Sequence, residues 1–336
     1  TDPVYIVKGA LEDARERNIH LYLLLLDLER AFDSVEAWSL EWSYRWAGLT
    51  EDSVRMLSAL DGKGTARVIT PFGLTDPHVV WRGVRQGETL SPTKFILWLE
   101  PWLRHAKALY GHYGHTLRGG ARLSHQAMAD DIAILTVAPL GMQVLAESCG
   151  RFMAFHAVTI SAKKTVLCSS SETGLVITFP VLDRASTPEV PRTSICRLRA
   201  DLSNKPHRYL GDRVSVHHRW CGASAAMSPV LQFDVGALAK KRIGLAEALD
   251  YYSAVTLGKG GYFLPMARIT ATQLGNWDRK LRRIFARKAG MAPSGSASQV
   301  HASKPAGLGV TSISTLAIAS GLTELLKRLC SPGLLG

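Results

Sequence analysis

The sequence predicts an α/β (α+β) fold, with an antiparallel sheet in its first part and mainly helices in its last part. A continuous apolar run, Leu21–Leu26, ends in Asp27, as expected of a strand that is buried on both faces. Two short extended runs, 126–128 and 132–136, flank an Ala-Asp-Asp segment and predict a hairpin with two acids at its tip. From about residue 234 onward, the pattern is helical and basic.

Helices are expected on both sides of the first strand. Residues 5–17 have helical periodicity, and a helix over about 50–60 should be closed by Gly62. Between them, Asp33 and Glu36 have the spacing of a capping box and are expected to open a helix that Gly48 ends. That helix carries a tryptophan at every fourth position: Trp38, Trp42 and Trp46. This pattern is more typical of core packing than of a platform on which bases stack.

The middle of the chain alternates between extended and helical patterns. Extended segments are expected at 66–70 and 78–81, and Ser91 followed by Pro92 predicts the N-cap and first position of a long helix. A helix over about 142–156 should precede a pair of strands, near 158–160 and 166–168. The proline-containing stretch 169–204 is expected to form short strands and loops, and 290–304 to form a loop.

Composition restricts the class of protein. The 336 residues include 40 Lys and Arg against 28 Asp and Glu, so the chain is strongly basic and fits a polyanionic partner, although many basic proteins bind no nucleic acid. Five scattered cysteines without a CxxC pair argue against a disulfide framework and favour a reduced, intracellular setting. The run 217–221 lacks the paired ligand spacing of a zinc site. No apolar run is long enough to span a bilayer, so we expect no membrane partner.

The acidic residues beside apolar strands carry the chemical argument. Asp27 ends one predicted strand, and Asp130 and Asp131 lie at the hairpin tip. Carboxylates in such places are costly unless they are paired, solvated or bound to metal. Two Mg²⁺ ions held by such acids can activate a 3′-hydroxyl and stabilise a leaving pyrophosphate. An isolated Asp-Asp pair is more often a solvated turn, so the argument depends on the whole ordered set of motifs.

Five segments, in order, resemble the motifs of reverse transcriptases of the non-LTR retrotransposon and group II intron type. They are LDLERAFDSV at 26–35, GVRQGETLSP at 83–92, MADDIAI at 128–134, SAKKT at 161–165 and YLG at 209–211. The segment AGLGV at 306–310 also resembles non-LTR elements. The resemblance implies an RNA-directed DNA polymerase with a right-hand architecture: a palm built on an antiparallel sheet, partial fingers and a helical thumb. The expected domains are palm and partial fingers over 1–216, a linker over 217–233 and a basic thumb-like region over 234–336.

The resemblance also assigns metal ligands. It implies that Asp27 and Asp130 bind two Mg²⁺ ions, for which Mn²⁺ can substitute, and that the Leu28 carbonyl helps to hold one of them. Asp131 would support the same metal site. Lys164 lies where the family carries a lysine near the triphosphate, and it would protonate or stabilise the leaving pyrophosphate. A solvated surface lysine is an equally good interpretation of Lys164.

A pocket for the incoming dNTP is implied by two further motifs. Phe32 occupies the position of the steric gate, whose ring would clash with a 2′-hydroxyl, although a core aromatic is the plainer interpretation. Gln86 and Gly87 should line the pocket, and Gly87 would let the backbone approach closely. Arg85 would contact template or phosphate, or else be simply exposed.

The implied partners are an RNA template, a DNA primer and dNTPs. The 209–211 motif, Tyr209, Leu210 and Gly211, would grip the primer end. Three arginines lie four residues apart on a predicted helix: Arg279, Arg283 and Arg287. They would contact template–primer phosphates, and the alternative is that they form a solvated cationic face.

Some positions depart from the family pattern. Met128 replaces the usual aromatic residue, Glu88 and Thr89 replace the usual acid-proline pair, and Ser161 replaces asparagine. No segment matches the fingers motifs expected before residue 1, so we expect a fragment of a larger polyprotein with weak activity of its own. A group II intron maturase and a degenerate copy that only binds RNA are the alternatives. A retrotransposon protein would need access to the nucleus.

Overall fold

A computed structural model describes residues 3–62, 64–80, 82–85, 87–171, 174–183, 192–203, 205–217, 221–266, 269–292, 300–301 and 307–330. The chain divides into two compact units. One contains residues 9–203, and the other contains residues 204–336 together with residues 1–8. Helix α1 (Pro3–Glu16) contributes to both units. Among the described residues, no helix is both long and apolar enough to cross a bilayer.

The 9–203 unit is built on a four-stranded antiparallel sheet in the order β12-β1-β10-β9. Its strands are β1 (Tyr22–Leu26), β9 (His125–Met128), β10 (Asp131–Thr136) and β12 (Val166–Ser169). Every residue of β1 is buried, which confirms the predicted central strand. The β9–β10 hairpin confirms the second predicted feature.

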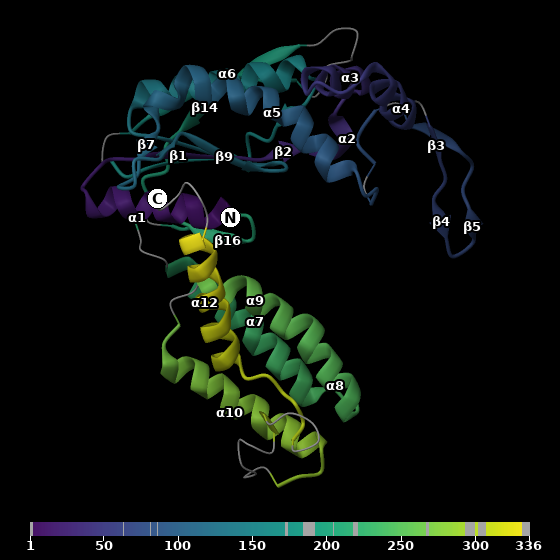
Figure 1. Cartoon of the computed structure of the whole chain (residues 1–336), viewed down its shortest axis with the longest axis vertical. Coiled ribbons are helices and arrows are strands. Elements are labelled where there is room, and N and C mark those ends of the chain that lie inside the picture. Colours follow the sequence, from purple (N-terminus) through teal and green to yellow (C-terminus); the bar gives the residue numbers. More distant parts are fainter. Residues whose placement is uncertain are drawn as a thin grey trace. The chain divides into compact units, whose positions relative to one another are not determined.

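Two long helices, α5 (Ser91–Tyr110) and α6 (Pro139–Phe155), cover one face of this sheet (Figure 1). Alternate strand residues, including Leu24, Leu26 and Ile132, share a buried core with Phe95 and Trp98 of α5. Because strand side chains alternate between faces, their neighbours in β1 point to the other side of the sheet.

The unit also contains shorter helices and two-stranded pairs. The helices are α2 (Ala31–Ser34), α3 (Ala37–Trp46), α4 (Glu51–Asp61) and the 3₁₀ turn η1 (Gly111–Tyr113). Four pairs join strands that are close in sequence: β3 (Gly64–Ala66) with β6 (His78–Val80), β4 (Ile69–Thr70) with β5 (Gly73–Leu74), β7 (His115–Thr116) with β8 (Arg122–Leu123), and β13 (Val176–Leu182) with β14 (Thr193–Arg199). One pair joins distant segments: β2 (Leu28–Glu29) with β11 (Thr159–Ile160).

Helix termini follow the predicted signals in some places and not in others. Gly48 has a φ of +81°, and the amides of Gly48 and Leu49 donate to the last turn of α3, so glycine ends this helix as expected. The predicted capping box is wrong, because Asp33 lies within α2 and the N-cap of α3 is Glu36, without a side-chain cap. Ser91 is the first residue of α5 rather than its N-cap, and its hydroxyl donates to the Arg85 carbonyl.

The tryptophans of α3 lie on its outer side, so the prediction that they pack in the core is wrong. Trp38, Trp42 and Trp46 are 47%, 44% and 40% exposed. The inward side of α3 instead carries Leu40, Tyr44 and two serines, and the Ser39 hydroxyl accepts a 2.7 Å hydrogen bond from the buried Trp98 indole. The row borders an open groove of about 880 Å³ between α3, α5 and α6.

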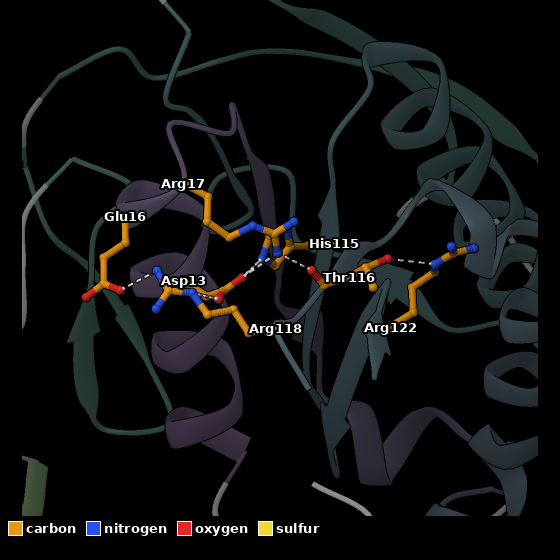
Figure 2. Close-up of polar contacts among 7 residues, drawn as sticks. All are labelled: Asp13, Glu16, Arg17, His115, Thr116, Arg118 and Arg122. Atoms are coloured by element: carbon orange, nitrogen blue, oxygen red, sulfur yellow. Dashed lines mark hydrogen bonds and ion pairs between the residues drawn. The ribbon is translucent and has the colours of Figure 1, made fainter. Parts of the chain in front are cut away.

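Polar contacts tie the end of α1 to strand β7 (Figure 2). Asp13 accepts hydrogen bonds from His115 Nε2 at 2.6 Å and from Arg17 at 3.1 Å, and Arg17 also donates to the Thr116 carbonyl at 2.7 Å. Arg118 lies 3.5 Å from the same carboxylate. Burial alone would raise the pKa of Asp13, but the hydrogen bonds from His115 and Arg17 outweigh it and lower that pKa.

Two further predictions are corrected in this region. The segments β11 and β12 do not pair with each other, because β11 pairs with β2 and β12 pairs with β1. The stretch 169–204 contains a regular hairpin, β13–β14, rather than only short strands and loops.

The other unit is mainly helical, as predicted for the C-terminal part. It contains a hairpin of β15 (His207–Tyr209) and β16 (Asp212–Val214), followed by helical elements: α7 (Cys221–Lys240), α8 (Leu245–Tyr251), the π-helix η2 (Tyr252–Leu257), α9 (Gly258–Phe263), the 3₁₀ turn η3 (Leu264–Met266), α10 (Ala271–Lys288) and α12 (Ile313–Cys330). A separate core joins these helices through Leu238, Tyr252, Leu281 and Phe285. The predicted linker over 217–233 is wrong from Cys221 onward, where α7 begins. Most of the predicted loop 290–304 lies outside the described residues.

Candidate active site

The carboxylate of Asp27 lies where β1 ends and is surrounded by a segment from much later in the chain. The Ser161 amide donates to the Asp27 carbonyl at 2.8 Å, and the Asp27 amide donates to the Thr165 hydroxyl at 3.4 Å. Within the same turn, the Lys164 ammonium lies 3.2 Å from Asp27 Oδ2. The fold therefore brings together the first and fourth predicted motifs, with Lys164 still 71% exposed.

Two adjacent acids occupy the tip of the β9–β10 hairpin. Asp131 pairs with Met128, so the turn consists of Ala129 and Asp130, and Ala129 has a φ of +53°. A residue with a side chain is strained in this left-handed region, by roughly 1–2 kcal/mol. Asp130 and Asp131 are both half-buried.

The sheet register relates these acids to Asp27. Leu26 pairs with Ile132 at the end of the β1–β10 ladder, and the next residues beyond this pair are Asp27 and Asp131. Leu26 and Ile132 both belong to the core under α5 and α6. If the same register and alternation continued, Asp27 and Asp131 would lie opposite each other on the other face of the sheet.

The donor chemistry at this edge of the sheet fits a divalent metal. Asp27 Oδ2 is buried and, apart from its ion pair with Lys164, has no hydrogen-bond partner among the described residues; hard carboxylate oxygens of this kind are what Mg²⁺ prefers. Leu28, whose carbonyl is a predicted ligand, pairs with Ile160 in the β2–β11 ladder. Across the part of the chain that the structure describes, however, no three His, Cys, Asp or Glu side chains gather into a metal-binding group. The convergence of Asp27, Asp130 and Asp131 stays a prediction.

Phe32, the predicted steric gate, lies in α2 at the border of the core. Its ring stacks on Phe95 of α5, with centroids 4.6 Å apart and an angle of 25° between the planes. Phe32 is only half-buried, so its ring is at once a core contact and partly accessible.

The loop of the second motif begins with two backbone contacts to α2 and its C-terminal end. The Gly83 amide donates to the Val35 carbonyl at 2.9 Å, and the Val84 amide donates to the Phe32 carbonyl at 2.6 Å. Gly83 has a φ of +104°, and a Cβ there would lie 2.9 Å from the Cα of Asp33. Glycine is therefore required at position 83 by both its conformation and the close approach of α2.

The middle of this loop carries the residues predicted to line the nucleotide pocket. Gly87 is exposed and has a φ of +89°, with no atom within 4 Å of the position that a Cβ would occupy. Its backbone conformation, rather than any close protein contact, accounts for glycine here. Arg85 is exposed, and Gln86 lies outside the described residues.

A buried lysine that the motif comparison did not identify holds the far end of the loop. Lys94 of α5 is 3% exposed, and its ammonium donates to Asp61 at 2.7 Å and to Glu88 at 3.2 Å. The second oxygen of Asp61 accepts a hydrogen bond from the Tyr44 hydroxyl at 2.6 Å. Burial disfavours the lysine cation, but the hydrogen bonds to Asp61 and Glu88 outweigh burial and raise the pKa of Lys94. A lysine four residues before Trp98 on the apolar face of α5 was the available sequence signal.

The predicted primer-grip residues lie in the other unit, at the β15–β16 turn. Leu210 and Gly211 have φ values of +49° and +80°, as in a two-residue type I′ turn. The Tyr209 side chain is 2% exposed, so it packs inward. Beside it, the buried carboxylate of Asp212 forms an ion pair with Lys8 and accepts the Arg213 amide.

The basic helix of the same unit is α10. Its inward side is apolar, with Leu281 and Phe285 buried. The predicted phosphate-contacting residues are all exposed: Arg279, Arg283 and Arg287.

The chain is similar in sequence to proteins of one family. The family described as reverse transcriptase (RNA-dependent DNA polymerase) matches residues 4–214. The Pol polyprotein of the type-1 retrotransposable element R2 of Popillia japonica is 25% identical over 191 residues, which cover 53% of this chain and 27% of that protein. The Pol polyprotein of the type-2 element R2DM of Drosophila melanogaster is 27% identical over 164 residues, which cover 48% of this chain and 15% of that protein. Among solved structures, apo telomerase from Candida tropicalis is similar with a TM-score of 0.46 and 11% identity, over 86% of this chain and 45% of that chain.

Proposed function

Because the chain belongs to the reverse transcriptase (RNA-dependent DNA polymerase) family, we propose that it carries the polymerase centre of a non-LTR retrotransposon protein. The chain spans about a quarter or less of the two retrotransposon relatives, so the template, the primer and the remaining domains of a polyprotein are part of the same proposal. The observation that carries it is the 3.2 Å approach of Lys164 to Asp27, directly after the last residue of β1.

In this proposal, the chain's own residues divide the work of nucleotide addition. Asp27 and Asp130, with the Leu28 carbonyl and Asp131, would hold two Mg²⁺ ions. Those ions supply activation of the primer 3′-hydroxyl and neutralisation of the leaving pyrophosphate. Lys164 is long, exposed and next to Asp27, so it can reach a triphosphate and donate a proton or a hydrogen bond to the pyrophosphate oxygen.

Selection of dNTPs would come from the α2 side of the site. The Phe32 ring is held by stacking on Phe95, so a 2′-hydroxyl that met its accessible edge would not displace it easily. The exposed backbone of Gly87 would lie along the incoming nucleotide. The exposed arginines of α10 would bind template–primer phosphates without sequence preference, as a translocating enzyme requires.

Primer extension on an RNA template, with dNTPs and Mg²⁺, tests the proposal. The chain would be assayed alone and within its complete reading frame, beside Asp27→Asn, Asp130→Asn and the matched control Asp76→Asn, an exposed acid of the β5–β6 loop. We expect the first two substitutions to reduce extension by at least about 100-fold, because metal stabilisation of the transition state is worth several kcal/mol. The control should extend normally.

Salt-dependent RNA binding, measured on the same variants, separates polymerisation from binding alone. A protein that binds RNA equally well in all four forms, but extends primers no better than Asp130→Asn, would be a binding-only copy. That outcome would refute the polymerase proposal.

A further inference from the structure

We propose that Lys94 is a positioning residue for the incoming nucleotide, holding the Gly87 loop through Glu88 while its neighbour Phe95 supports the Phe32 ring. The inference rests on the proposed function and adds a residue outside the five motif segments to the nucleotide pocket. Three observations carry it. The Lys94 ammonium is buried, the loop 83–88 is anchored at both ends, and both Lys94 and Phe95 lie at the start of α5.

The Lys94 ammonium is buried in a place where two carboxylates compete for it. Its exposed fraction is 3%, that of Asp61 is 4% and that of Glu88 is 29%. A buried amine is costly unless it is paired, and Asp61 alone, at 2.7 Å, would already pair it. Glu88 adds a second contact, at 3.2 Å and 3.3 Å from its two oxygens, and this contact ties the ammonium to the loop of the second motif.

This second contact closes a short loop. At its start, the Gly83 and Val84 amides are bonded to the carbonyls of Val35 and Phe32. At its end, Glu88 is bonded to Lys94, and the Glu88 amide also donates to the Arg85 carbonyl at 3.4 Å. Residues 85–87 lie between these anchors, and no atom lies within 4 Å of the position that a Cβ of Gly87 would take. Ser91 also contacts this segment, because its hydroxyl donates to the Arg85 carbonyl and its amide donates to the Glu88 carbonyl at 3.1 Å. In this proposal, the Lys94–Glu88 pair acts together with these Ser91 contacts to place Gly87.

The same turn of α5 supports the opposite side of the predicted pocket. Phe95 is fully buried and stacks on Phe32 at 4.6 Å, while the Phe32 carbonyl receives the Val84 amide. A shift at the start of α5 would thus move the gate and the loop together. In this proposal, Lys94 and Phe95 together place the two groups that would meet the nucleotide, Gly87 and Phe32.

The experiment compares Glu88→Gln with Asp61→Asn, which remove different partners of the same ammonium. Extension of oligo(dT) on poly(rA) would be followed at varied dTTP concentration. We expect Glu88→Gln to raise the KM for dTTP by about 10-fold, the loss of one charged hydrogen bond, with the affinity for template–primer unchanged. Glu88→Asp keeps the carboxylate and should stay near the original KM.

Asp61→Asn reports the structural role of Lys94 instead. It should lower the thermal midpoint by more than Glu88→Gln does, because Asp61 also binds Tyr44, and it should change the KM less. Hydrogen exchange gives a readout that does not depend on turnover: Glu88→Gln should speed exchange of the amides of 84–90 by about 10-fold, and leave those of the α5 interior unchanged.

The outcomes separate the two claims. Suppose that the unaltered chain extends primers. If Glu88→Gln then keeps the original KM for dTTP, or keeps the original exchange rates of the amides of 84–90, the role of Lys94 is overturned and the proposed function still stands. An unaltered chain that extends no primer in any context would overturn the proposed function and this inference with it.

Discussion

Replacing Gly83 with alanine tests whether the second-motif loop is locked against α2. A Cβ at this position would lie 2.9 Å from the Cα, 3.0 Å from the carbonyl oxygen and 3.1 Å from the carbonyl carbon of Asp33. All three atoms belong to the backbone, so no side-chain rotation relieves the clash. The loop has to move away from α2, and its hydrogen bonds to Val35 and Phe32 lengthen.

The expected loss follows from two contributions. A side chain at a φ of +104° costs about 1–3 kcal/mol, and each of the two backbone hydrogen bonds is worth about 1 kcal/mol. We therefore expect Gly83→Ala to lower the free energy of unfolding by about 3–5 kcal/mol.

Gly48→Ala is the matched control for this variant. Gly48 also has a positive φ, +81°, but no atom lies within 4 Å of the position that its Cβ would take. Only the conformational cost applies, roughly 1–2 kcal/mol. Urea unfolding with an unchanged m-value measures both losses. If the two variants lose the same stability, the contact with Asp33 does not constrain the loop, and the reasoning about position 83 is wrong.

Three other variants test separate parts of the fold. Burial lowers the pKa of His156 to about 4, from an ordinary value of 6.5, so the unfolded chain takes up its proton first and stability should fall by up to roughly 3 kcal/mol as the pH drops from about 6.5 to 4. His156→Leu should remove that part of the pH dependence, whereas His105→Leu, at an exposed site, should leave it in place. Ala129→Gly should leave stability unchanged or raise it by up to about 1 kcal/mol, since glycine relieves the positive φ, and a clear loss in thermal unfolding would contradict the strained turn. Three exposed arginines of α10 are replaced together by glutamine: Arg279, Arg283 and Arg287. This should reduce the slope of the logarithm of the RNA association constant against the logarithm of the salt concentration by about 2–3, whereas Arg45→Gln should not change that slope.

The strand that carries Asp27 could be predicted because its signal is local. Six consecutive apolar residues followed by an acid are enough to indicate a buried strand, and the hairpin around Asp130 has the same kind of short-range pattern. The end of α3 was also predictable, because a glycine at a positive φ is what the closing turn of a helix requires.

The direction of a helix face was not predictable in the same way. Spacing showed that Trp38, Trp42 and Trp46 share one side of α3, but not which side meets the core. The side of α3 that faces the core depends on Trp98, which belongs to another helix and packs its indole against the small Ser39.

Two other features depended on partners distant in sequence. Pro180 made 176–182 look irregular, yet among the described residues this segment pairs with a single strand, and a two-stranded ladder has open edges that tolerate proline. Gly150 of α6 lets the Pro180 carbonyl approach to 2.6 Å from where a Cβ would be. The role of Lys94 was hidden because Asp61 and Glu88 reach it from separate elements.

The outward row of tryptophans differs in solvent exposure from Trp98, which lies in the core of the same unit. The indoles of Trp38, Trp42 and Trp46 face solvent, so iodide should quench their fluorescence and their emission should lie to the red. Trp98 is fully buried and hydrogen-bonded, so its emission stays shielded until the core around Ser39 opens. With the other four tryptophans replaced by phenylalanine, the quenched emission would report contacts at the groove beside α3, and the unquenched emission would report whether the core around Trp98 is intact.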